Sequence, residues 1–233
     1  MSNVPPIPPA QVPALPWESR SGRDPVGAFV ETARLFATNP DEAWRITAER
    51  GGIEAPLVYA LVISLLGSIV SFVYRWLFVS PFARMMSGPA FQRFGWLAGR
   101  RPRGCGIVFF PIGAAIGILI GIFICAAILH LFVLLVGAAR TSASGFEGTF
   151  RVVGYASTAS IAQVIPFVGG LIAIVWWIVL AVKGVQRMHR TTSGRAVAAV
   201  LLPMAVLAVC VFIAIVVVVG LFLAVGHRPP STL

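Results

Sequence analysis

The chain has 233 residues, of which 58% are hydrophobic and 11% are charged. Soluble domains carry about a quarter charged residues, so this composition excludes an ordinary soluble domain. The formal charge of +10 arises from seventeen arginines and one lysine, Lys183, against eight acids. Because these cations flank apolar runs and do not gather on one soluble face, membrane topology explains them better than nucleic-acid binding.

The first 25 residues contain seven prolines, a density that favours solvated polyproline II. We therefore predict a disordered, proline-rich N-terminal tail over residues 1–25, followed by a membrane domain over residues 26–233. The three cysteines are far apart and predict neither a disulfide framework nor a metal site. No metal or other cofactor is expected.

Residues 26–50 predict two short amphipathic helices that precede the first span. Asn39 suits the N-cap of the second helix, Pro40 suits its first position, and Gly51 and Gly52 are expected to stop it. Trp44 provides an aromatic anchor for the membrane interface. Two interpretations stay open, namely a docking surface that lies on the membrane and a cover for the spanning bundle.

Five apolar stretches predict membrane-spanning helices, since roughly 20 apolar residues cross a hydrocarbon core. Their approximate bounds are 57–78, 109–138, 150–165, 168–186 and 196–225. The predicted fold is therefore all-α, a polytopic integral membrane protein with a five-helix transmembrane bundle preceded by two short amphipathic interfacial helices. With the N-terminus inside, eleven Arg and Lys residues lie on its side of the membrane and six on the other, which places that end in the cytoplasm.

The loop after the first span carries Arg100, Arg101 and Arg103 close together. Such a cluster attracts anionic lipid with about 1 kcal/mol per cation. An ordinary flanking charge cluster explains it equally well, and both interpretations remain open.

The second predicted span carries two features of note. Gly113, Gly117 and Gly121 recur every four residues, which makes a smooth ridge where another backbone can approach closely. His130 lies nine residues beyond Gly121, on a different side of the helix. An intramembrane histidine is a functional candidate, whereas a lone one is also a common hydrogen-bonded packing residue.

The third predicted span carries Tyr155, Ser157, Thr158 and Gln163, which point in several directions at 100° per residue. We therefore expect protein on all sides of it. These polar groups either tie helices together or line a polar path. Residues 166–170, with Pro166, Gly169 and Gly170, are expected to form the turn into the fourth span.

One series of residues carries a resemblance to a known family. It comprises Gly145-Phe146, Arg151 to Ser157, Pro166 and Gly169-Gly170, followed by a tryptophan-containing helix that ends before a basic connector. This series resembles the Yip-one domain family. The resemblance covers about residues 27–226. It implies a five-span fold with the N-terminus inside, and Gly154, Tyr155, Pro166, Gly169 and Gly170 match its hairpin positions. It implies no catalytic residue. The family is named for interaction with Ypt/Rab-type GTPases, but its N-terminal acidic-aromatic-Gly-Pro motif has no counterpart before residue 26.

These observations predict a non-enzymatic membrane organiser or adaptor that binds the lipid bilayer and other membrane proteins, or a second copy of itself, and no nucleic acid. The alternative is a transporter, channel or lipid-moving subunit with a polar path along the third span. An intramembrane enzyme would need Ser157 and His130 as a pair, without an evident orienting carboxylate. The arginine-rich composition suggests a bacterial source, which places the protein in the cytoplasmic membrane.

Overall fold

The computed structural model describes residues 14–22, 24–74, 77, 104–140, 142 and 144–226. Every regular element in these residues is a helix, which confirms the predicted all-α class. The predicted lipid-binding cluster of Arg100, Arg101 and Arg103 lies outside the described residues. The elements in chain order are α1 (Pro25–Thr38), α2 (Pro40–Ile46), α3 (Glu54–Tyr74), α6 (Gly104–Leu135), α7 (Gly145–Ala156), the 3₁₀-helix η2 (Ser157–Val164), α8 (Gly169–His189) and α9 (Ser193–Gly226).

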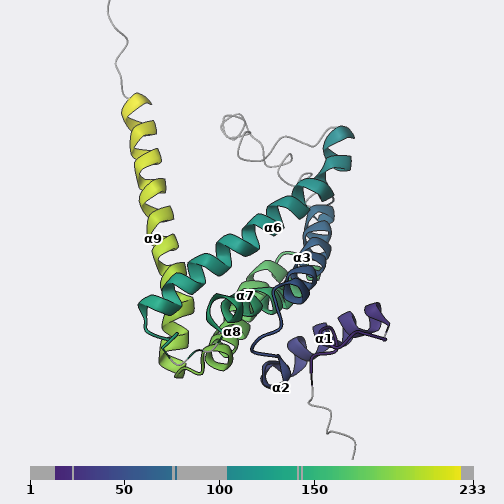
Figure 1. Cartoon of the computed structure of the whole chain (residues 1–233). Coiled ribbons are helices and arrows are strands. Elements are labelled where there is room, and N and C mark those ends of the chain that lie inside the picture. Colours follow the sequence, from purple (N-terminus) through teal and green to yellow (C-terminus); the bar gives the residue numbers. More distant parts are fainter. Residues whose placement is uncertain are drawn as a thin grey trace, which may run out of the picture.

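Four of the described helices are long and apolar enough to cross a membrane. They are α3, α6 from Phe109 onward, α8, and α9 as far as Gly220. They correspond to the first, second, fourth and fifth predicted spans, with ends that differ by a few residues. Figure 1 shows α6 crossing over the group formed by α3, α7 and α8, while α9 leaves this group and diverges from α6.

The third predicted span, 150–165, is not a single α-helix. It consists of the last part of α7 and of η2, and α7 already begins at Gly145. The Ser157 hydroxyl donates to the Gly154 carbonyl (2.5 Å), and the Thr158 hydroxyl donates to the Tyr155 carbonyl (2.7 Å). Such local bonds compete with the α-helical ladder, which explains the change to a 3₁₀-helix at this point.

The second of the two short helices before α3 begins where its predicted cap places it. The Asn39 side chain accepts a hydrogen bond from the backbone of Glu42, and Pro40 is the first residue of α2. The second helix ends earlier than expected, at Ile46, because the backbone and hydroxyl of Thr47 both bond to the Ala43 carbonyl. Gly51 and Gly52 therefore belong to the connection into α3 and do not stop α2.

Part of the predicted disordered tail is folded. Leu15 and Trp17 are buried in the core, and residues 16–19 form a turn. The Trp17 indole donates to the Ala55 carbonyl (2.8 Å), and its backbone donates to the Thr32 hydroxyl (3.0 Å). Leu15 and Trp17 can pack into the core although several prolines surround them in the sequence. The proline-rich composition of the segment therefore did not reveal that part of it folds.

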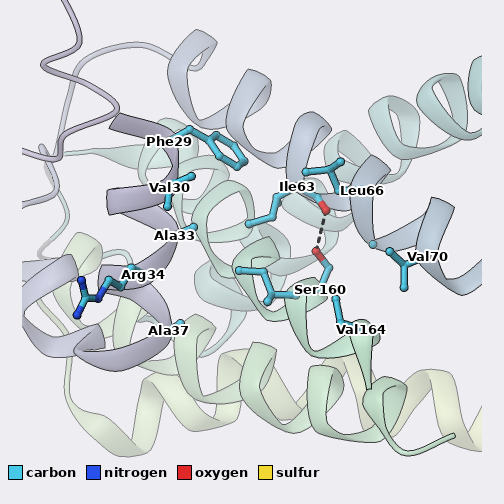
Figure 2. A pocket seen from close by; sticks show the side chains of 12 residues that line it. Phe29, Val30, Ala33, Arg34, Ala37, Ile63, Leu66, Val70, Ser160 and Val164 are labelled. Carbon is cyan, nitrogen blue, oxygen red and sulfur yellow. Dashed lines mark hydrogen bonds between the residues drawn. The ribbon is translucent and has the colours of Figure 1, made fainter. Parts of the chain in front are cut away.

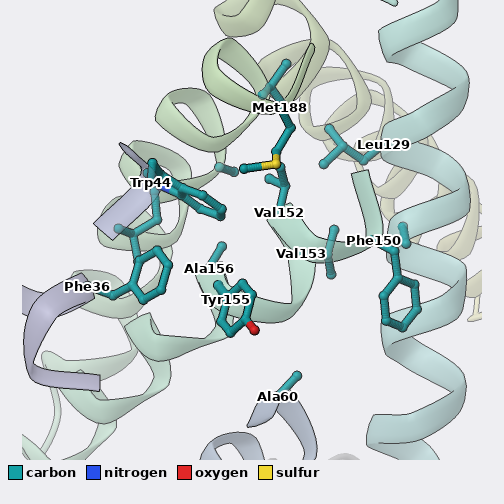
Figure 3. Packing of buried hydrophobic residues seen from close by; sticks show 14 of the residues in the cluster. Phe36, Trp44, Ala60, Leu129, Phe150, Val152, Val153, Tyr155, Ala156 and Met188 are labelled. Atoms are coloured by element: carbon teal, nitrogen blue, oxygen red, sulfur yellow. The ribbon is translucent and has the colours of Figure 1, made fainter. Parts of the chain in front are cut away.

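Helix α7 forms the centre of the core. All its residues from Gly148 to Ala156 are buried, and it packs against α3, α6 and α8. Figure 3 shows its side chains between Phe36 of α1, Trp44 of α2, Leu129 of α6 and Met188 of α8. The expectation that protein surrounds the third segment is thus confirmed for α7. It is wrong for the side of η2 that carries Ile161 and Val164, which are exposed.

Candidate interaction site around helix α7

One face of α7 carries three polar side chains that hold the N-terminal part of the chain. Glu147, Arg151 and Tyr155 are spaced four residues apart, so they share a face of the helix. Glu147 Oε1 accepts hydrogen bonds from the backbone of Gly51 (2.7 Å) and Gly52 (2.8 Å). Arg151 Nη1 donates to the Gly52 carbonyl (2.9 Å). These bonds fix the connection between α2 and α3 against α7.

Glu18 completes this face from far away in the sequence. Its carboxylate pairs with Arg151 Nη2, and the same oxygen accepts a hydrogen bond from the Tyr155 hydroxyl (2.6 Å). The Arg151 side chain is only 1% exposed, and that of Glu18 is 13% exposed. A buried cation requires such a partner, because an isolated charge in the protein interior carries a large desolvation cost. The segment around Trp17 and Glu18 is therefore part of the folded domain.

An aromatic cluster surrounds Tyr155 and joins it to the first three helices. The Phe36 and Tyr155 rings stack with centroids 5.3 Å apart and planes at 9°, and Trp44 meets Phe36 edge-on at 4.9 Å. Tyr59 of α3 adds a tilted contact to Tyr155 at 5.3 Å. Figure 3 shows Phe36 and Trp44 lying on the same side of α7 as Tyr155. This cluster fixes the Tyr155 ring, whose hydroxyl bonds to Glu18, among α1, α2 and α3.

Acids of the α2 region pair with the basic end of α8. Lys183 pairs with Asp41, and Glu49 accepts from Arg187 (3.2 Å) and Arg190 (2.9 Å). The sequence suggested flanking cations here, without a specific partner. These pairs are partly exposed, so each one adds little to stability. Together they place the basic end of α8 and the N-terminal helices at the same end of the molecule.

The polar residues of η2 bond within the chain. The Thr158 hydroxyl contacts the Tyr59 hydroxyl (2.7 Å), and Gln163 Oε1 accepts from Ser71 of α3 (2.7 Å). Ser160 donates to the Ile63 carbonyl (3.2 Å). These contacts join η2 to α3. They fit the interpretation that the polar residues of this segment tie helices together.

His130 does not stand alone. Its Nδ1 lies 2.8 Å from the Thr149 hydroxyl, which lies 2.9 Å from Nε2 of His189, and Nδ1 of His189 lies 2.9 Å from the Ser142 hydroxyl. This hydrogen-bonded chain links α6, α7 and α8. Ser157 bonds to a backbone carbonyl instead, so the structure does not bring it together with His130 as a nucleophile and base. Among the described residues, no group of three or more potential ligands is placed to hold a metal ion.

The glycines singled out from the sequence fall into two groups. A Cβ at Gly154 would lie 2.8 Å from the Pro56 side chain, and one at Gly169 would collide with the Ala162 carbonyl, so both positions need the close approach that glycine allows. Gly170 faces open space. Pro166 lies in the predicted turn, which covers residues 166–168 before α8 begins at Gly169.

The ridge of Gly113, Gly117 and Gly121 faces open space. A Cβ at any of the three would have no described neighbour within 4 Å. The close helix approach expected at this ridge is therefore not made by the described part of the chain itself.

Two hollows flank η2. Figure 2 shows the first, a groove of about 460 Å³ between α1, α3 and η2 that is lined mainly by apolar side chains, with Arg34 turned away from its centre. The second is a wide cavity of about 610 Å³ that is open to the outside and lies between α3, α6, η2 and α8, with one lining residue each from α7 and α9. It is lined by Ser64, Ile118, Gly121, Ile122, Cys125, Val153, Ser157, Ala159, Ser160, Gln163, Gly170, Ala173, Ile174, Trp177 and Met204.

Sequence reasoning found Tyr155, Gly154 and the polar residues of η2, but it missed Glu18 and the role of Arg151. Arg151 stood only in the series that carries the family resemblance and among the cations that favour the orientation, with no partner assigned to it. The available signal for Glu18 was its position directly after Trp17, within a segment otherwise dominated by prolines.

The family model described as Yip1 domain matches residues 33–215. Neither the curated proteins nor the solved structures contain a match to this chain.

Proposed function

The chain belongs to the Yip1 domain family and is an integral membrane protein, and we propose that it is non-enzymatic and organises its membrane by binding other membrane proteins or lipids. The observation that carries this proposal is the large apolar surface on α6 and α9 that no other described part of the chain covers. Residues Ala196, Ala199 and Val200 are buried at the start of α9, whereas no residue from 201 to 220 is buried.

The glycine ridge of α6 supports a protein partner in particular. Gly113 and Gly117 face open space on a helix whose length and composition suit a membrane span. Small residues at such a surface let a second helix approach closely, and van der Waals packing then stabilises the contact. A helix from another membrane protein or from a second copy of this chain fits this surface.

We further propose that α7 and η2 together make a fifth crossing. The Ser144 hydroxyl, at the start of α7, donates to the Met188 carbonyl at the end of α8 (2.8 Å). At the other end, Gly169 at the start of α8 lies against Ala162 of η2. The two elements therefore run antiparallel to α8 over its length, which favours a five-helix bundle.

The orientation that we propose places the N-terminus in the cytoplasm of a bacterial cell, with α1 and α2 at the membrane interface. The basic end of α8 then lies on the cytoplasmic side, as the positive-inside rule favours. Anionic lipid is a proposed ligand of Arg100, Arg101 and Arg103. Mapping the accessibility of single cysteines tests this orientation, and labelling of residue 190 from the outside of intact cells would contradict it.

Site-specific photo-crosslinking in native membranes tests the adaptor role. A crosslinking residue at Gly117 or Val211 is expected to give discrete protein adducts, because both positions are exposed on the proposed surface. Ala181, which is fully buried, serves as the control position and should give none. Adducts with lipid alone at both exposed positions would show that the adaptor role is wrong.

A further inference from the structure

The cavity between α3, α6, η2 and α8 lies at the depth of the membrane-spanning helices. Its lining includes Ser64 from the middle of α3, Ile122 from α6 and Trp177 from the middle of α8. No charged side chain is among its lining residues in the described part of the chain. Its volume of about 610 Å³ falls in the range of cavities that hold small ligands, about 300–1,000 Å³.

Polar groups gather on the wall that α3 and η2 form. The Ser157 and Ser160 hydroxyls already donate to backbone carbonyls, and the oxygen of the Gln163 amide accepts from Ser71. The nitrogen of that amide and the hydroxyl of Ser64 have no hydrogen-bond partner among residues that the structure describes. In a hydrocarbon environment, polar groups without a partner carry a free-energy cost that a ligand can remove.

A second hollow of about 290 Å³ continues the cavity toward α9. Gly121, Cys125, Trp177 and Met204 line both spaces, so they mark the passage between them. The remaining lining of the second hollow is apolar and comes from α6 and α9, with Ile128, Val200 and Leu207 among its residues. The two spaces together offer a polar wall at one end and a hydrocarbon-lined extension at the other.

We propose that this double cavity binds an uncharged lipid with carbonyl or hydroxyl groups, of the diacylglycerol class. Its polar group bonds to Ser64 and Gln163, and one of its hydrocarbon chains passes Gly121 into the second hollow. The absence of a charged group from the described lining disfavours a phosphate, because a buried anion without a cationic partner is strongly destabilised. This inference names a lipid for the lipid-binding part of the proposed function.

Photoaffinity labelling of the purified full-length chain in liposomes tests the proposal. The probe is a diacylglycerol with a diazirine in one acyl chain, and the comparison probe is phosphatidylglycerol with the same labelled chain. We expect the diacylglycerol probe to label peptides of α6 and α8 around Cys125 and Trp177, and the phosphatidylglycerol probe to label them several-fold less. Equal labelling by the two probes would overturn the proposal, because it would indicate ordinary contact with bilayer chains.

Two variants and one control identify the site. A leucine at Gly121 has open space for its side chain and fills the passage, so labelling should fall several-fold. Gly194→Leu, which also has open space for its side chain and lies outside the lining of both hollows, should label like the unaltered protein. Ser64→Ala, which removes one hydrogen bond, should weaken competition by unlabelled diacylglycerol roughly 2- to 10-fold. Unchanged labelling in Gly121→Leu together with unchanged competition in Ser64→Ala would refute the site.

The adaptor role and the lipid site can each be refuted without the other. Loss of the protein adducts formed from Gly117 or Val211 bears on the adaptor role, whereas the lipid site depends on Ser64, Gly121 and Gln163. A chain that labels with diacylglycerol and forms no protein adduct would retain the lipid site and lose the adaptor role.

Discussion

Replacing Glu18 by glutamine removes the carboxylate that faces the buried guanidinium of Arg151. The glutamine keeps the size of the side chain and an oxygen that can still accept from Arg151 and Tyr155. What is lost is the charge, and Arg151 is then left with Glu147, whose oxygen lies 4.0 Å away. Removing one partner of a buried pair lowers the free energy of unfolding by about 3–5 kcal/mol. Because Glu147 remains near Arg151, we expect a loss at the lower end of this range, about 3 kcal/mol.

For a chain of this length, a loss of that size lowers the unfolding midpoint by roughly 6–12 °C. The midpoint is measured on purified protein in mild detergent by the change in tryptophan fluorescence on heating. Glu42→Gln is the matched control, since the pair that Glu42 forms with Arg45 lies on the exposed surface of α2. We expect no measurable shift from that control.

A double-mutant cycle separates the pair from other effects. If the loss in Glu18→Gln comes from the stranded guanidinium, the same change should cost little in an Arg151→Met background. Tyr155→Phe retains the stacking on Phe36 and loses only the hydrogen bond to Glu18, so it should cost less than Glu18→Gln. If the Glu18→Gln protein unfolds at the same midpoint temperature as the unaltered protein, the assignment of residues 14–22 to the folded domain is refuted.

Three further changes test other parts of the core. Gly169→Ala should lower the yield of folded protein, because its methyl group meets a backbone carbonyl of η2, whereas Gly170→Ala should not; equal yields on size-exclusion chromatography would contradict this contact. Thr149→Val removes the hydroxyl between the two histidines and should cost about 1–3 kcal/mol in thermal unfolding, and an unshifted midpoint would mean that the hydrogen-bonded chain is unimportant. Gly184→Ala places a methyl group 2.7 Å from the Trp44 ring and should displace α2, which increased proteolysis near residue 44 would report; an unchanged cleavage pattern would disprove the contact.

Much of the fold follows from local sequence patterns. Apolar length predicts α3, α6, α8 and α9, since a helix that satisfies its own backbone is the simplest way to place an apolar run in a membrane. The start of α2 at Pro40 follows from the Asn39 cap in the same local manner. The close approach at Gly154 and Gly169 agrees with the positions singled out in the hairpin, although the neighbours of these glycines did not follow from their own sequence.

The site itself depends on contacts between residues that are distant in sequence. Glu18 and Arg151 are separated by 133 positions, and His130 and His189 meet through Thr149. No periodicity links such residues, because their distance is set by how α7 packs among its neighbours. The sequence by itself determined that this chain lives in a membrane as a set of helices, for which local hydrophobicity suffices. Only the tertiary structure decided that Arg151 is a buried charge and not a flanking one, because burial depends on what other segments bring to the same place.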